Sequence, residues 1–176
     1  MSLLNTLTIE TATGEIKEIF DEIQSAFGMV PNGVGLWSVN PERLKEQWAN
    51  IKNTMSKDEE TQKLQTIIRY LVSEVNSCEY CIGLNGGMLI NMYGMTQDSL
   101  LEMEKNPSSA PLNIKNKALL LFALKSIKDS KSVTIQDINV LKELAITEKE
   151  IFDIVYDASR MLVVNTLFET FKVQAE

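Results

Sequence analysis

The chain of 176 residues contains no histidine. Histidine is the usual general base, metal ligand and proton shuttle near neutral pH, so its absence excludes Ser-His-Asp and Cys-His hydrolases and zinc sites with imidazole ligands. No apolar run approaches the ~20 residues needed to span a membrane, and the N-terminus lacks the basic and apolar regions of a signal peptide. We therefore expect a cytoplasmic protein.

Basic side chains are outnumbered, with 17 Lys and Arg against 24 Asp and Glu, for a formal net charge of −7. Binding to nucleic acid or to an anionic membrane surface requires basic surface. The composition therefore argues against nucleic-acid and membrane partners. The length predicts one domain over residues 1–176, large enough to bury a core without a disulfide or a structural metal.

Only 8 glycines and 4 prolines are present, too few for a fold built of many tight hairpins. Apolar residues instead recur with the helical period along most of the chain, as at Leu64, Ile68, Leu71 and Val75. We expect an all-α fold with N-terminal helices in residues 1–55, a cysteine-bearing core in 56–104 and C-terminal helices in 112–174.

Pairs of polar residues three positions apart predict helix starts as capping boxes. They are Ser56 with Glu59, Thr134 with Asp137, and Thr147 with Glu150. Residues 94–100 also echo residues 145–151, since each stretch ends one helix and caps the next. Ordinary helical punctuation and a duplicated helical unit both explain this echo.

Two cysteines, Cys78 and Cys81, lie three residues apart. They are either buried small hydrophobes, metal ligands or a redox pair. A metal site is disfavoured because the chain offers two thiols and no imidazole toward the usual four ligands. A redox pair is favoured because Cβ atoms three apart on a helix are about 5–6 Å from each other, and a small adjustment gives the ~3.5–4.5 Å of a disulfide.

Asn76 and Ser77 are capping residues that place the pair in the first turn of a helix over about residues 78–93, where unpaired N–H groups stabilise a thiolate. Glu74 and Glu79 would raise the pKa of the thiols if they lie nearby. Tyr80, with an ordinary pKa near 10, is a poor base at neutral pH.

The residues after the pair are also unusual. Asn85 shares a helical face with Cys81, and the Gly86-Gly87 pair predicts that another element packs closely there. Met88, Met92 and Met95 recur along the same segment, and such a stripe is typical of a core or a subunit interface.

The run from Val72 to Cys81 resembles the redox motif of the carboxymuconolactone decarboxylase family, in its alkylhydroperoxidase D-like (AhpD-like) branch. The turn at residues 94–96, the loop at residues 27–32 and the segments 117–122 and 133–138 resemble the same branch. The resemblance implies an all-α AhpD-like bundle, a trimer or hexamer, and peroxide reduction through the two cysteines.

The family's attacking cysteine corresponds to Cys81, and the cysteine that resolves the sulfenic acid corresponds to Cys78. At three polar positions this sequence differs from the family pattern. Thr66 stands where the family has the relay glutamate, Asn85 where it has the histidine after the second cysteine, and Tyr80 where it has another histidine. A neutral amide can donate a hydrogen bond to a thiolate but cannot accept its proton. Glu74 is either a substitute for the relay or an ordinary solvated helix residue.

The sequence thus predicts a weak thiol-dependent peroxidase or disulfide oxidoreductase that uses a peroxide substrate and an external dithiol reductant. A non-catalytic oligomer with a structural or redox-sensing cysteine pair is the alternative. Lactone decarboxylation is disfavoured, because that branch does not rely on the pair. No flavin, haem or nicotinamide motif is found, so we expect neither a cofactor nor a metal, and we expect a homo-oligomer.

Overall fold

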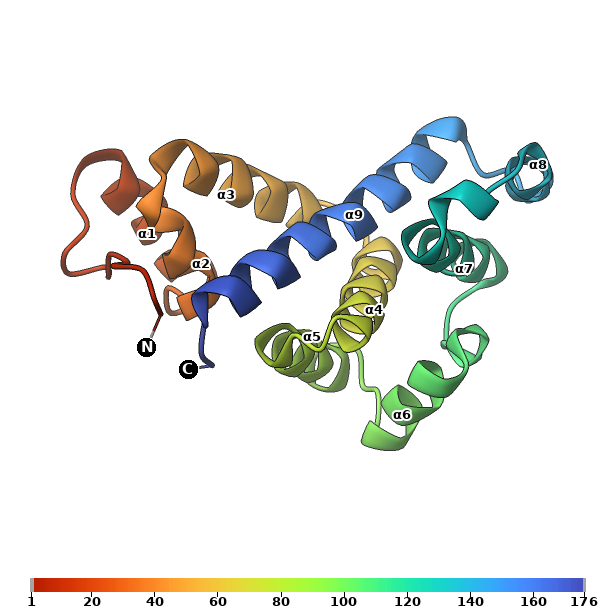
Figure 1. Ribbon diagram of the computed structural model, residues 1–176, viewed down its shortest axis with the longest axis horizontal. Helices are drawn as coiled ribbons and strands as arrows, with labels where there is room; N and C mark the ends of the chain where they lie inside the picture. Colours follow the sequence, from red (N-terminus) through yellow and green to blue (C-terminus); the bar gives the residue numbers. More distant parts are fainter. Residues whose placement is uncertain (1, 176) are drawn as a thin grey trace. The chain divides into compact units, whose positions relative to one another are not determined.

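The computed structural model describes residues 2–175, and across these residues it contains helices and no strand (Figure 1). The all-α prediction is therefore confirmed. The chain divides into two compact units, one formed by Met1–Lys57 with Leu167–Glu176 and the other by Asp58–Thr166. One domain across the whole length stays a prediction, and the two units are described in turn.

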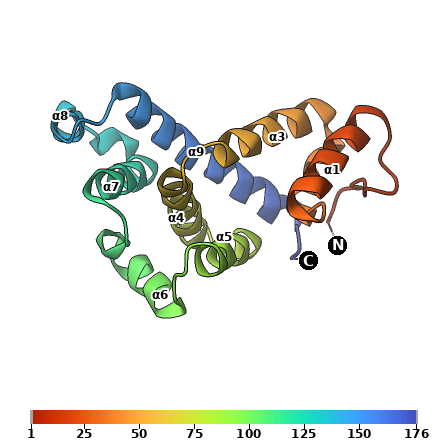
Figure 2. The same ribbon diagram turned by 180° about the vertical axis from the view of Figure 1, so that it is seen from behind.

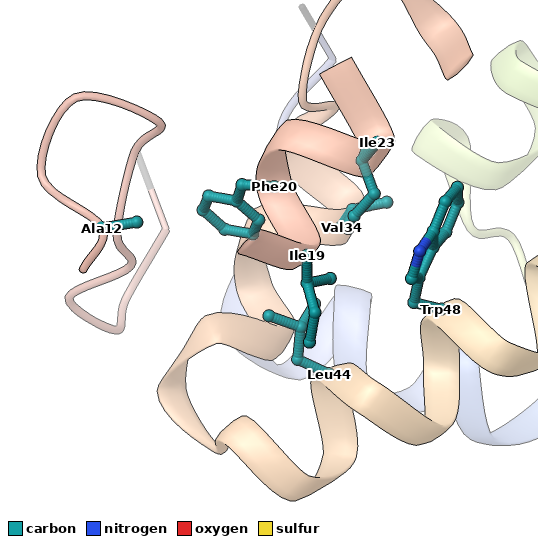
Figure 3. Packing of buried hydrophobic residues seen from close by; sticks show 7 residues of the cluster. All are labelled: Ala12, Ile19, Phe20, Ile23, Val34, Leu44 and Trp48. Carbon is teal, nitrogen blue, oxygen red and sulfur yellow. The ribbon is translucent and has the colours of Figure 1, made fainter. Parts of the chain in front are cut away.

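The first unit is built on a small helical core. Its elements are α1 (Gly14–Phe27), α2 (Asn32–Gly35), the 3₁₀ turn η1 (Leu36–Val39) and α3 (Pro41–Met55). Pro41 begins α3, and the Asn40 side chain accepts a hydrogen bond from the Arg43 N–H at 3.1 Å. The core brings together Ala12, Ile19, Phe20, Ile23, Val34, Leu44 and Trp48 (Figure 3).

The second unit carries the cysteines. It contains α4 (Glu59–Val75), α5 (Glu79–Asn91), α6 (Gln97–Lys105), η2 (Pro107–Ser109), α7 (Ile114–Lys128), η3 (Ser130–Ser132), α8 (Ile135–Glu143) and most of α9 (Glu148–Phe171). The α4 helix is buried on several sides and packs against α5, α6 and α7, with its most extensive contact on α5 (Figures 1 and 2). This burial makes α4 the central support of the cysteine region.

Two of the predicted capping boxes are confirmed. The Thr134 N–H donates to the Asp137 carboxylate at 2.7 Å before α8, and the Thr147 N–H donates to the Glu150 carboxylate at 2.7 Å before α9. The echo between residues 94–100 and 145–151 is also visible in the backbone. Gly94 and Ala145 both have positive φ, at 65° and 54°, and each precedes a threonine that begins a capping box.

Two details of the predicted α4 helix are wrong. The N-cap of α4 is Asp58, not Ser56. Ser56 ends α3, so the loop before α4 is short, and the Asp58 carboxylate accepts a hydrogen bond from the Thr61 N–H at 2.9 Å. Val75 was expected on the apolar stripe, yet it is 82% exposed because α4 ends at this residue.

The methionine stripe does not form one surface. Met88 is half-buried, Met92 is 59% exposed and Met95 is buried, because α5 ends at Asn91 and the chain turns before Met95.

The two adjacent glycines of α5 have different surroundings. A Cβ atom at Gly86 would lie 3.2 Å from Cε2 of the buried Tyr70 ring, so the predicted close approach is confirmed there. A Cβ atom at Gly87 would meet nothing within 4 Å, so the same prediction is wrong for Gly87.

This difference predicts opposite effects of alanine at the two positions. Gly86→Ala should lower the free energy of unfolding by about 1–2 kcal/mol, because the Tyr70 ring must move in a packed core. Gly87→Ala should raise it by about 0.5–1 kcal/mol through better helix propensity. Urea denaturation of both variants measures the contrast, and a change of the same sign in both would contradict it.

Candidate active site

The cysteines lie at the start of α5, as predicted. The predicted capping residues are wrong: Cys78 itself caps α5 and Cys81 lies in its first turn, because Asn76 is the C-cap of α4 and Ser77 forms the turn between the two helices. The chain reaches Cys78 from α4 through Ser77, whose φ is 54°, and the Cys78 N–H donates to the Ser73 carbonyl at 3.1 Å. This tight connection fixes the pair against the C-terminal end of α4.

The two sulfurs are in contact and buried. The Cys78 thiol donates to the Cys81 sulfur, the Sγ atoms are 2.7 Å apart, and the two residues are 0% and 1% exposed. Both are thiols, not a disulfide. A disulfide bond is about 2.03–2.05 Å long, so only a small approach of the sulfurs is required to form one.

The pKa of the Cys81 thiol is raised above its ordinary value. The hydrogen bond with Cys78 is the largest cause and burial is the second. Two sulfurs in contact titrate as a unit, because one negative charge opposes a second at this distance. Its place in the first turn of α5 therefore does not leave Cys81 with a lowered pKa.

Amide and hydroxyl groups surround the Cys81 sulfur. The side chains of Asn165 and Ser73 lie within hydrogen-bonding reach of it, and both lower the pKa of the thiol against the two larger causes. Asn165 Nδ2 donates to Ser73 Oγ at 3.1 Å, and Asn76 Nδ2 donates to Asn165 Oδ1 at 3.3 Å. The sulfur therefore meets neutral polar groups where a charged base would be expected.

Thr66 and Asn85, the two positions that the sequence resemblance assigns to a proton relay, are joined by an arginine. Arg69 Nε donates to Asn85 Oδ1 at 3.0 Å, and Arg69 Nη2 donates to Thr66 Oγ1 at 2.8 Å. Asn85 Nδ2 in turn donates to the Cys81 carbonyl at 2.7 Å. Asn85 thus lies one helical turn after Cys81 and bonds its backbone carbonyl, and a cation lies between Thr66 and Asn85 where a proton acceptor would be needed.

Arg69 belongs to a larger polar cluster. Burial is the main cause that lowers the pKa of its guanidinium, and the nearby Asp157 opposes that change. Burial likewise raises the pKa of Asp157, which accepts a hydrogen bond from Gln65 Nε2 and is also stabilised by Arg160. The buried Gln65 Oε1 has no hydrogen-bond partner. The attraction of Arg69 and Arg160 for Asp157 therefore opposes the effect of burial on the charged forms of Arg69 and Asp157.

The remaining predicted residues have other surroundings. Glu74 is half-buried, and its pKa is raised by burial and by Glu104, while its hydrogen bond with Tyr70 acts in the opposite direction. The Tyr70 hydroxyl donates to Glu104, and burial raises the pKa of that hydroxyl. Tyr80 is buried. The contacts of Glu74 are thus with a tyrosine and a second carboxylate.

Residues 2–175 contain no group of three Cys, Asp or Glu side chains placed to hold a metal ion. The groups that do meet at the site are two adjacent thiols and the neutral side chains of Ser73, Asn76 and Asn165. Sequence reasoning missed Arg69, Ser73 and Asn165. The available signal was the recurrence of polar residues at the helical period on α4, at Gln62, Thr66, Arg69, Ser73 and Asn76.

Along the described part of the chain, none of the helices combines the length and the apolar character required to cross a membrane.

No protein-family model matches the sequence, and no curated protein matches it.

Solved structures share the fold of this chain. One is an alkylhydroperoxidase AhpD core, an uncharacterized peroxidase-related protein from Ralstonia eutropha JMP134, with a TM-score of 0.83 and 24% identity over 99% of this chain and 92% of that one. Another is an uncharacterized peroxidase-related protein from Silicibacter sp. TM1040, with a TM-score of 0.82, 24% identity and the same coverage of both chains. The chain therefore has the AhpD-like fold that the sequence motif predicts.

Proposed function

We propose that this protein is a thiol-dependent peroxidase in which Cys81 attacks the peroxide and Cys78 resolves the product. The observation that carries the proposal is the 2.7 Å contact between two buried thiols at the start of a helix. The AhpD-like fold supports it, since the similar solved structures are described as peroxidase-related.

The proposed cycle balances without a cofactor. The Cys81 thiolate attacks one peroxide oxygen, so an S–O bond forms as the O–O bond breaks, and the departing alkoxide takes up the proton that the thiol released. The Cys78 thiol then attacks the sulfenic sulfur, which forms the disulfide and releases water. An external dithiol reduces the disulfide by exchange and leaves as its own disulfide.

Burial of both cysteines favours small peroxides over bulky ones. The raised pKa of Cys81 keeps the thiolate fraction low at neutral pH, and no imidazole is present to remove the proton. We therefore propose a slow enzyme that becomes faster as the pH rises. Assembly as a homo-oligomer is part of the proposal, and exposed Phe152, Tyr156 and Val163 on α9 support it.

A stoichiometric oxidation tests this function. One equivalent of hydrogen peroxide should convert both thiols into an intramolecular disulfide, seen by mass spectrometry as the loss of two hydrogen atoms from a single chain. Dithiothreitol should restore the thiols and sustain peroxide consumption, faster at about pH 9 than at pH 7. The double variant Cys78→Ser with Cys81→Ser supplies the background rate. Two intact thiols after excess peroxide, or disulfides only between chains, would refute the proposal.

A redox-sensing pair without turnover is the second candidate. The complete burial of Cys78 favours it, because burial slows reduction of the disulfide. The neutral surroundings of Cys81 favour it too, because no nearby group takes up the thiol proton quickly. In that case the disulfide forms once with peroxide, while added dithiol sustains no consumption above the background of the double variant.

A further inference from the structure

Asn165 is a polar residue on the buried face of α9. The buried side chains that precede it on this face are Ile151, Ile154, Ala158 and Met161, which repeat with alternating steps of three and four residues, and Asn165 continues the same repeat at 2% exposure. An amide at such a position costs stability unless its polar atoms are bonded. Its partners therefore identify what the amide is there to hold.

The hydrogen bonds around Asn165 fix the direction of its amide. Its Oδ1 accepts from Asn76 Nδ2 at 3.3 Å, so Nδ2 is the end that faces Ser73 and Cys81. The Ser73 hydroxyl donates its single proton to the Arg69 carbonyl at 2.6 Å. Ser73 therefore offers a lone pair to the Asn165 amide, which retains a second N–H on the side that faces the cysteine pair.

We propose that Asn165 is the hydrogen-bond donor that stabilises the Cys81 thiolate. Its amide lies beside the cysteine pair, because Asn165 Nδ2 donates to Ser73 Oγ and the Ser73 carbonyl accepts the Cys78 N–H. It stands in for the positive charge that other thiol enzymes place beside the sulfur. The inference deepens the proposed function, on which it rests only for the choice of Cys81 as the reactive sulfur. Cys78 is the titratable neighbour with the largest influence on Cys81, so the contribution of Asn165 is best measured with Cys78 replaced.

The experiment is a thiolate titration, followed by ultraviolet absorption, in a Cys78→Ser background. Serine suits the capping position and leaves Cys81 as the one thiol. Replacing Asn165 with leucine, which is close in size but has no donor, should raise the pKa of Cys81 by about 1–2 pH units, the value of a hydrogen bond to a charged group. Asn76→Ala is the matched control, because it removes an amide from the same network without removing the donor to the sulfur. It should move the pKa by less than half as much.

A second variant keeps the test decisive if leucine prevents folding. Asn165→Asp preserves the shape of the side chain but replaces the donor by a carboxylate, so the pKa of Cys81 should rise further than with leucine. An unchanged pKa in a folded Asn165 variant, or an equal change in Asn76→Ala, would overturn the inference. Because the titration needs no turnover, its result is separate from that of the peroxidase assay.

Discussion

Cys81→Ser will lose peroxide consumption, whereas Cys78→Ser will keep a single turnover. The first change removes the nucleophile, so the rate should fall on the order of 10³-fold, to the background of the double variant. The second leaves the attacking sulfur but removes the thiol that lies 2.7 Å from it, so a sulfenic acid accumulates on Cys81. Dimedone trapping with mass spectrometry measures that species at one per chain.

The two variants control each other, since each removes one sulfur from the same buried pair. If Cys78→Ser loses the first turnover and Cys81→Ser retains it, attack comes from Cys78 and the roles drawn from the family resemblance are exchanged. Equal loss of the first turnover in both would show that neither thiol alone reacts with peroxide.

Arg69→Leu will cause the largest loss of stability among the polar residues discussed. It leaves the oxygens of the buried Asn85 and Thr66 without their donor and removes a cation that faces Asp157. Stranding these groups should lower the free energy of unfolding by about 2–5 kcal/mol, measured by urea denaturation. Adding Asp157→Leu should recover part of the loss, because the unpaired carboxylate is then gone.

Lys142→Leu provides the matched control within the same compact unit. Lys142 also bonds a carboxylate, that of Glu148 at 2.6 Å, but both side chains are exposed. An exposed ion pair contributes little, so this variant should leave the free energy of unfolding close to that of the parent protein. Equal losses for Arg69→Leu and Lys142→Leu would mean that the Arg69 cluster contributes no more than a surface pair.

Local chemistry made much of the fold predictable from sequence. The helical period gave the all-α class, and the boxes at Thr134 and Thr147 marked helix starts because their partners lie three residues away. The cysteine motif led to the AhpD-like fold for the same reason, since its residues are adjacent in the chain. Each of these signals is contained in fewer than about a dozen residues.

The surroundings of the sulfurs could not be predicted in this way. Asn165 and Ser73 are far apart in sequence, and nothing local shows that an asparagine on one helix contacts a serine on another. Arg69 is one of many basic residues, and its bonds to Thr66 and Asn85 depend on the packing of α5 against α4. Val75 was wrongly predicted to be buried, because the helical period does not show where neighbouring elements stop packing against a helix.

Because the cysteine pair is buried, access to the sulfurs limits the rate at which larger reagents react with them. A small peroxide needs little space, but a dithiol reductant must bring its own sulfur to Cys78 or Cys81, which are 0% and 1% exposed. The first turn of α5 must therefore open transiently before reduction. An opening free energy of about 2.8 kcal/mol would leave the sulfurs accessible about 1% of the time and slow reduction about 100-fold. The rate of reduction would then depend on how often the α4–α5 connection opens, and the disulfide would persist between these infrequent openings.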